Sequence, residues 1–353
     1  MNPPAARTSR LLPVIAVLLA SCSTVPPSEF SSGEKTYLNP VLERDFPDPA
    51  VLRDADGWFY AYATQSEAAG RILNVQVARS RDLVRWEHLG DALPEKPRWA
   101  AGKQNFWAPH VIYDGARSTY VMYFSAEPDS GNGKCLAVAT SAGPAGPFAD
   151  TGKPLLCGGG VEHIDPMAFD DPRTSKRLLY WGSGSTPIRV RELTPDRLDF
   201  LPGSAAVNLI FPDAQSRYRA LIEGAWVIHR DGSYYLFFSG DRCCGPKADY
   251  ALMVSRARDA FGPFEALAGP ILEENAVWRA PGHGSVVTDG AGDDWIVYHA
   301  VSTTLFRSMD RAGGGVTPRA MLLDRVVYHD GWPRIAGDQP SVTRQRAPLA
   351  GGR

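Results

Sequence analysis

The segment Gly232-Ser-Tyr-Tyr-Leu-Phe-Phe-Ser239, a polar turn followed by an aromatic-rich run, has four counterparts elsewhere in the chain. The counterparts are Asp56–Ala63, Ser118–Ser125, Lys176–Ser183 and Asp293–His299. The five segments recur at intervals of about sixty residues, and a fixed period of this kind indicates a repeat architecture. Each interval has room for four short strands and their loops, which is one propeller blade. The predicted fold is therefore all-β, a five-bladed β-propeller.

A second shared element supports this interpretation, because a turn followed by Trp or Phe lies close to the end of each of the first four units. Its copies are Asp82–Trp86, Gly146–Phe148, Asp196–Phe200 and Gly262–Phe264. Short runs rich in aromatic and β-branched residues, separated by Gly, Pro and Asp turns, favour strands over helices. The length of 353 residues also suits two β-sandwich domains. The repeat continues through every possible midpoint, however, so one propeller domain is predicted over residues 37–347.

The first 22 residues are expected to be a targeting segment that is not part of the fold. Arg7 and Arg10 precede an apolar run, Leu11–Ala20, that is too short to span a bilayer. The run ends in Leu19-Ala20-Ser21-Cys22, which resembles a bacterial lipobox, so Cys22 is expected to carry lipid. The alternative is an ordinary signal peptide with an incidental cysteine.

Residues 23–36 are rich in Ser and Pro and predict a flexible tether. The expected location is that of an exported bacterial lipoprotein at the outer membrane or the periplasmic face, or otherwise of a secreted protein. In an oxidising compartment the four remaining cysteines could form disulfides, and a Cys135–Cys157 bridge is plausible beside the adjacent Cys243 and Cys244. Their spacing fits no zinc site.

The formal net charge is −2, from 37 basic and 39 acidic side chains. Such a chain has no basic field that would gather nucleic acid, so a neutral partner is expected.

Ahead of each aromatic segment lies another short β-like run, and the residues that open these runs differ between units. The runs are Asp48-Pro-Ala-Val-Leu, Ala108-Pro-His-Val-Ile, Asp165-Pro-Met-Ala-Phe, Glu223-Gly-Ala-Trp-Val and His283-Gly-Ser-Val-Val. The innermost strands of a propeller line its axis, so equivalent strand ends converge on one pocket. A single Asp before Pro is usually a turn former. Three acidic residues and a histidine in register instead predict a functional site.

Two carboxyl groups are what glycoside hydrolysis requires, one to donate a proton and one to activate water or attack carbon. A third carboxylate nearby can hold the acid in its protonated form. The sequence therefore predicts a glycoside hydrolase whose catalytic residues are Asp48, Asp165 and Glu223.

Taken in order, the motifs resemble those of glycoside hydrolase family 43, which includes arabinanases, α-L-arabinofuranosidases and β-xylosidases. The resemblance extends from Asn39 to about Ile335. Its motifs are Asn39-Pro-Val-Leu, Phe46-Pro-Asp-Pro-Ala50, Phe106-Trp-Ala-Pro109, His163-Ile-Asp-Pro166, Glu223-Gly224 and Pro281-Gly-His-Gly-Ser285. It implies a five-bladed propeller and an inverting mechanism that requires no cofactor. It also implies that Asp48 is the general base, that Glu223 is the general acid, and that Asp165 orients Glu223 and keeps it protonated.

The resemblance extends to other site residues. Phe46 and Trp107 either shape the sugar pocket or belong to the propeller core. Arg319 is either directed at the sugar or the acid, or is an ordinary surface arginine. His283 is similar to an axial histidine that helps to hold a hydrated calcium or other ion, and such an ion would have to be held mostly by water because imidazole is not a preferred calcium ligand.

Two further features resemble arabinan-cleaving members, namely the Cys243-Cys244 pair and the Trp295–His299 run. They favour α-L-arabinofuranosyl glycans as substrates, with β-xylosidase or exo-galactanase activity as the alternative. The rival from another class is a carbohydrate-binding propeller without catalysis. The expected partner is an oligo- or polysaccharide, with no nucleic acid, and membrane contact only through the lipid.

Overall fold

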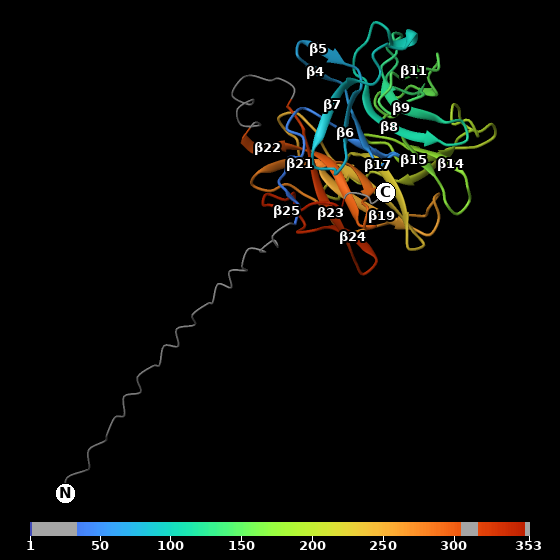
Figure 1. Ribbon diagram of the computed structural model, residues 1–353. Helices are drawn as coiled ribbons and strands as arrows, with labels where there is room; N and C mark the ends of the chain where they lie inside the picture. The colour runs from blue at the N-terminus through green and yellow to red at the C-terminus, as the bar shows by residue number, and fades with distance from the viewer. Residues whose placement is uncertain (2–33, 305–316, 350–353) are drawn as a thin grey trace. The chain divides into compact units, whose positions relative to one another are not determined.

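The computed structural model describes residues 34–304 and 317–349 together with Met1 (Figure 1). The predicted lipid-bearing Cys22 and most of the predicted signal segment and tether lie outside these residues. In the part of the chain that is described, no helix has both the length and the apolar character needed to cross a membrane.

Five antiparallel sheets, each with its strands in chain order from the axis outward, account for nearly all of the regular structure. From the inner strand outward, the first blade is β2 (Ala50–Arg53), β3 (Phe59–Ala63), β6 (Gln76–Ser80) and β7 (Trp86–Asp91), and the second is β8 (Trp107–Asp114), β9 (Thr119–Ala126), β10 (Cys135–Ser141) and β11 (Ala149–Asp150), with β12 (Leu156–Cys157) also paired to β10. The third blade is β13 (Met167–Asp170), β14 (Arg177–Trp181), β15 (Ile188–Glu192) and β16 (Val207–Ile210), and the fourth is β17 (Ile222–Arg230), β18 (Ser233–Gly240), β19 (Ala251–Ala257) and β20 (Glu265–Ala266). The fifth blade is β21 (Trp278–Thr288), β22 (Asp294–Ser302), β23 (Ala320–His329) and β24 (Trp332–Ile335). Outside the blades lie the pairs β1 (Thr36–Tyr37) with β25 (Gln345–Arg346) and β4 (Ser66–Ala68) with β5 (Arg71–Leu73), and a short 3-10 helix, η1 (Arg98–Ala100).

The inner strands contact one another in a closed ring, from β2 through β8, β13, β17 and β21 and back to β2. The first blade, blue in Figure 1, therefore lies beside the fifth, which is orange to red. This arrangement confirms the predicted five-bladed β-propeller.

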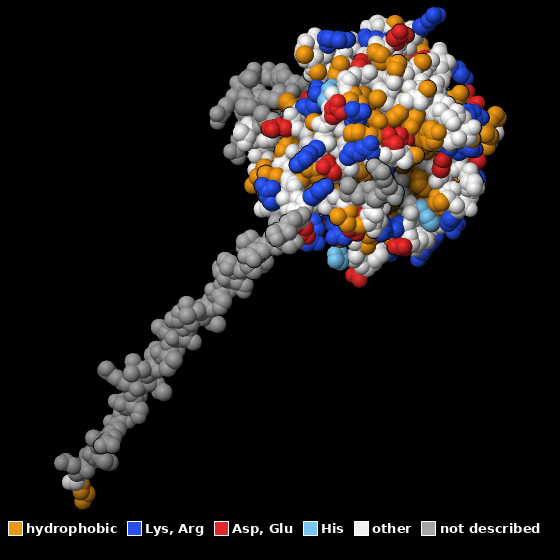
Figure 2. Space-filling view, in the orientation of Figure 1, with side chains coloured by type: hydrophobic (Ala, Val, Ile, Leu, Met, Phe, Trp, Pro, Cys, Tyr) orange, Lys and Arg blue, Asp and Glu red, His pale blue; other side chains and the backbone are white. Residues whose placement is uncertain are grey.

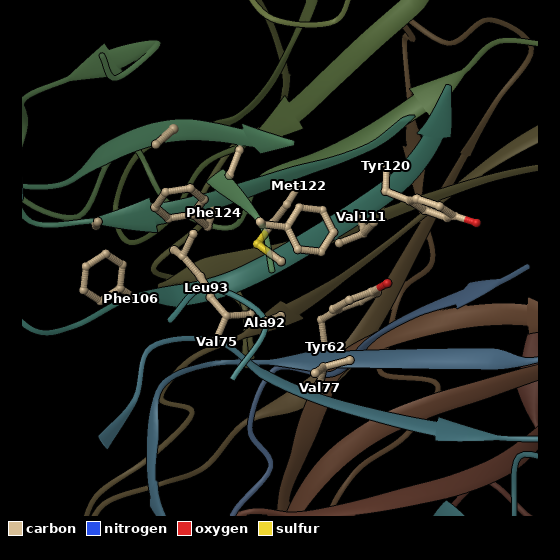
Figure 3. Close-up of a cluster of buried hydrophobic side chains, with 14 of the residues drawn as sticks. Tyr62, Val75, Val77, Ala92, Leu93, Phe106, Val111, Tyr120, Met122 and Phe124 are labelled. Carbon is tan, nitrogen blue, oxygen red and sulfur yellow. The ribbon is translucent and has the colours of Figure 1, made fainter. Parts of the chain in front are cut away.

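The aromatic segments form the second strand of each blade, where both faces of the sheet are covered by neighbouring blades. Every residue of β3 is buried, so the segment has no polar alternation. Figure 3 shows one interface of this kind, in which Tyr62 and Val77 of the first blade approach Met122 and Phe124 of the second. The repeat is aromatic because large flat side chains fill the space between radiating sheets.

The N-terminal segment closes the ring by lying along β23 of the fifth blade. The Asn39 side chain accepts a hydrogen bond from the Leu323 amide (2.9 Å) and donates to the Leu323 carbonyl (3.0 Å) and to Ser341 Oγ (2.8 Å). Further along, the Phe46 amide donates to the Arg319 carbonyl (2.9 Å). Closure of the propeller thus also sets the position of Arg319 near the axis.

Two disulfides lie on the propeller. Cys135 and Cys157 are joined with an S–S distance of 2.01 Å, which links β10 to β12 as the sequence allowed. The adjacent Cys243 and Cys244 are also paired, in the loop between β18 and β19.

On the face shown in Figure 2, basic and acidic side chains are interspersed, in agreement with the small net charge.

Candidate active site

At equivalent places around the axis, each inner strand has a residue with a left-handed backbone conformation, either shortly before the strand or within it. These residues are Asp48 (φ 56°), Ala108 (φ 45°), Asp165 (φ 58°), Gly224 (φ 66°) and His283 (φ 48°). In four of the five, the backbone N–H donates to a side chain at the end of the second strand of the preceding blade. The bonds run from Asp48 to His299 Nδ1 (3.1 Å), from Ala108 to Thr64 Oγ1 (2.8 Å), from Asp165 to Ser125 Oγ (3.1 Å) and from His283 to Ser239 Oγ (2.8 Å). These bonds fix the starts of the inner strands around the axis.

The remaining residue of this ring, Gly224 in the fourth blade, makes a different hydrogen bond, and the difference brings two carboxyl groups together. In the third blade, Gly182 occupies the position that is Thr, Ser or His in the other blades. The equivalence follows from the backbone, because the Gly182 amide donates to the Ile164 carbonyl just as the Thr64 amide donates to the Pro47 carbonyl. Because Gly182 has no side chain, the Gly224 amide donates to Asp165 Oδ2 instead (2.9 Å). Asp165 is thereby held beside Glu223.

The structure changes the register that the sequence suggested for the fourth blade. Gly224, not Glu223, takes the left-handed position that Asp48 and Asp165 take in their blades. Glu223 lies one residue earlier, within β17 and opposite Ser239. Its carboxylate still lies near Asp165, because the Glu223 charge acts on the pKa of that residue.

Asp48 is a buried carboxylate with four polar side chains around it. Thr64 donates to its Oδ2 (2.5 Å) and Arg319 Nη1 to its Oδ1 (2.9 Å), while Nδ1 of His283 and of His299, the latter accepting from the Asp48 amide, each lie 3.3 Å from Oδ1. Burial by itself would raise the pKa of Asp48, but the Arg319 charge holds that pKa well below its usual range. Asp48 is thus ionised at neutral pH, as a general base must be.

Glu223 is half-buried and accepts a hydrogen bond on each oxygen. The Ser183 hydroxyl donates to Oε2 (2.7 Å) and the Tyr250 phenol to Oε1 (2.8 Å). The Tyr250 ring stacks on His299, with centroids 5.7 Å apart and planes 7° from parallel. One aromatic pair therefore links the surroundings of Asp48 to those of Glu223.

Asp165 differs from Asp48 because no lysine or arginine of the described residues lies within ion-pair distance of it, and Nδ1 of the neutral His283 lies 3.9 Å from its Oδ2. Burial, and then the charges of Glu223 and Asp48, raise the pKa of Asp165 well above its ordinary value. Asp165 therefore keeps its proton at a pH where an isolated carboxyl has lost it. The site combines an ionised base with a carboxyl group that keeps a proton beside Glu223, which is a combination that acid–base hydrolysis can use.

The remaining predicted residues fall into different places. Trp107 is half-buried at the axial end of β8, and Lys134 Nζ lies 3.5 Å from its ring centre, so it is placed to shape a pocket. Phe46 is fully buried in the core with its ring edge-on to His88, so the pocket role suggested for it is wrong. Arg319 is buried rather than on the surface, and it contacts Asp48 rather than the acid.

The histidine predicted to help hold an ion has carboxylates as its nearest charged neighbours. Burial lowers the pKa of His283, so its ring is neutral at neutral pH. Among residues 34–304 and 317–349, no three His, Cys, Asp or Glu side chains form a group that could hold a metal ion. These donors do not fit a directly coordinated ion, and no step of the chemistry below depends on one.

Sequence reasoning missed four side chains that contact the carboxyl groups: Thr64, Ser183, Tyr250 and His299. Three of them had a signal, because Ser183 and His299 end their aromatic segments and Thr64 directly follows the segment Asp56–Ala63. Tyr250 lies outside the repeat and had none.

Comparisons with known proteins agree with this geometry. A sequence profile described as Glycosyl hydrolases family 43 matches residues 37–333. A β-D-galactofuranosidase from Aspergillus niger is 32% identical over 74% of this chain and 75% of its own length. A probable arabinan endo-1,5-α-L-arabinosidase from Neosartorya fischeri is 24% identical over 82% of this chain and 90% of its own. A xylan 1,3-β-xylosidase from a Vibrio species is 25% identical over 89% of this chain, which spans 60% of the Vibrio protein.

A similar solved structure is that of a thermostable family-43 glycoside hydrolase. It superimposes with a TM-score of 0.73 at 26% identity, covering 90% of this chain and all of that one.

Proposed function

The chain belongs to glycosyl hydrolases family 43, and on that basis we propose that this glycoside hydrolase cleaves α-L-arabinofuranosyl linkages in arabinan or other arabinose-containing glycans. Two of the similar proteins named above support a furanoside substrate, since one is a galactofuranosidase and the other a probable arabinan-cleaving enzyme. β-D-Galactofuranose and α-L-arabinofuranose carry their ring substituents in the same arrangement and differ in the exocyclic chain. A site that accepts one sugar is therefore close to accepting the other.

The proposed reaction is a single displacement at the anomeric carbon. Asp48 takes a proton from the attacking water, while Glu223 gives its proton to the glycosidic oxygen as the C–O bond breaks. The observation that carries this proposal is the contrast between the two carboxyl environments. Asp48 is held ionised by Arg319, whereas Asp165, whose neighbour is Glu223, keeps its proton. With water as the nucleophile, the product has the inverted configuration.

A β-xylosidase or exo-galactanase would use the same residues, and the Vibrio xylosidase supports the first of these. A purely carbohydrate-binding propeller has no need for an ionised carboxylate beside a carboxyl group that keeps its proton, so the site favours catalysis.

The first prediction concerns the sugar. Among 4-nitrophenyl glycosides, we expect the highest kcat/KM for the α-L-arabinofuranoside, a lower value for the β-D-galactofuranoside and the lowest for the β-D-xylopyranoside, together with release of arabinose from linear arabinan. Proton NMR at early times should show the inverted anomer. A higher kcat/KM for the xyloside would contradict the arabinofuranosyl proposal and leave the catalytic roles intact.

We also propose that the chain is exported and anchored by lipid on Cys22. The lipobox-like sequence supports this location, and so does the Cys135–Cys157 disulfide, which suits an oxidising compartment. The second prediction is that the chain incorporates radiolabelled palmitate in a bacterial host, whereas Cys22→Ser does not. Equal labelling of both proteins would contradict the anchor.

A further inference from the structure

We propose that Tyr250 is a positioning residue for the catalytic acid. It holds Glu223 through Oε1 so that Oε2, the oxygen that faces Ser183, is the one that carries and delivers the proton. The inference rests on the acid role proposed above for Glu223.

The first observation is that the two oxygens of Glu223 have different partners. Tyr250 reaches Oε1 at 2.8 Å and Ser183 reaches Oε2 at 2.7 Å. Burial, followed by the charges of the nearby carboxylates, raises the pKa of Tyr250 well above its ordinary value, so the phenol keeps its proton. Oε1 therefore always faces a donor. An oxygen that accepts from a phenol is a poor place for a second proton, so the acid proton is left to Oε2.

The second observation is that a serine hydroxyl can reverse its role. Its hydrogen rotates freely, so Ser183 can donate to an ionised Oε2 or accept from a protonated one. In the resting acid, Oε2–H donates to Ser183 Oγ. When the glycosidic oxygen takes the place of Ser183, the Oε2–H bond breaks and an O–H bond forms on the leaving group. The electron pair of the broken bond stays on Oε2, and Ser183 turns to donate to it.

The third observation is that Tyr250 cannot move aside. Its side chain is almost completely buried, and its ring stacks on His299. On another side it lies against Gly282, where an added Cβ would overlap the Tyr250 ring and come within 2.9 Å of Ser239 Oγ. A phenol held in this way fixes Oε1, and through it the direction of Oε2.

The test is Tyr250→Phe, which keeps the stacked ring and removes only the hydroxyl. Protonation by an acid matters most for basic leaving groups, so phenyl, 4-nitrophenyl and 2,4-dinitrophenyl α-L-arabinofuranosides are compared for the wild type, Tyr250→Phe and Glu223→Gln. For Tyr250→Phe we expect kcat to fall about 10- to 100-fold on the phenyl glycoside and little on the dinitrophenyl one. The value of KM should be nearly unchanged. Glu223→Gln should show the same trend more steeply.

Tyr180→Phe is the matched control. Its phenol is buried in the third blade and donates to the Ala260 carbonyl at 2.8 Å, and it makes no hydrogen bond to the catalytic carboxyl groups. It should show no dependence on the leaving group. If the wild type prefers xylosides, the same aryl series of β-D-xylosides is used, so the result does not depend on the sugar.

The outcomes distinguish the positioning role of Tyr250 from the acid role of Glu223. If Glu223→Gln depends on the leaving group and Tyr250→Phe does not, or if Tyr250→Phe is fully active, the positioning role is wrong while the acid assignment stands. If Glu223→Gln itself shows no such dependence, the acid assignment of the proposed function fails first.

Discussion

Replacement of Asp48 by Asn is expected to lower kcat/KM by about 10²- to 10⁴-fold, the usual contribution of a general base. Asparagine has almost the same shape, and its one side-chain oxygen can still accept from Arg319, which now contacts Asp48 Oδ1 at 2.9 Å, while its NH2 group takes the position of Oδ2 beside the Thr64 hydroxyl. It cannot take a proton from water, however. The loss should appear in kcat for arabinofuranosides with every leaving group, because water must be activated in each case.

Asp294→Asn is the matched control for this prediction. Asp294 is also a buried aspartate paired with an arginine, since Arg230 Nη1 lies 2.7 Å from its Oδ2. It is the first residue of β22, whereas His299 lies towards the other end of the same strand. We expect Asp294→Asn to change kcat/KM by no more than a few fold. Retention of more than a tenth of the activity by a folded Asp48→Asn enzyme would exclude Asp48 as the base.

The fold could be predicted because every blade repeats the same physical requirement. A sheet that is covered on both faces needs an apolar second strand, and this need produces the aromatic segments. Closure of the ring could not be predicted in the same way. The Asn39 side chain contacts Leu323, which is 284 residues away, and no local pattern connects the two.

The three carboxylates could be predicted from their place in the repeat, but their neighbours mostly could not. The predicted alignment of the fourth blade was wrong by one residue, because Gly224 and not Glu223 has the left-handed conformation. Either Asp or Gly can adopt that conformation, and the sequence does not say which residue does so. Phe46 was ambiguous because an aromatic residue beside a motif can face the pocket or the core. Tyr250 was missed because a loop residue reaches the site only through the path of the folded chain.

The last prediction concerns Asp165, whose removal should lower activity while raising stability. With Asn at this position, the side-chain oxygen can still accept from the Gly224 amide. The carboxyl group that keeps its proton beside Glu223 is lost, so the alkaline limb of the kcat/KM profile should move to lower pH. For phenyl glycosides we expect kcat to fall about 100-fold, within the range for general acid catalysis.

The effect on stability follows from the direction of the pKa shift. Burial and the neighbouring carboxylates raise the pKa of Asp165 in the folded protein above its value in the unfolded chain. The stability contributed by such a group is fully present below the unfolded pKa and is lost as the pH rises through the folded pKa. At neutral pH the wild type therefore carries a cost that Asp165→Asn removes. The Tm of Asp165→Asn relative to the wild type should be higher at about pH 7 than at about pH 4.

Asp48→Asn supplies a comparison of opposite sign. The pKa of Asp48 is lowered in the folded protein, so its stabilising contribution is present above the unfolded pKa and is lost as the pH falls through the folded value. Relative to the wild type, the Tm of Asp48→Asn should therefore be lower at about pH 7 than at about pH 2, below the unfolded pKa. Two variants that both lose activity would then differ in the sign of their stability change with pH. If both changed in the same direction, the contrast between an ionised Asp48 and a protonated Asp165 would be wrong.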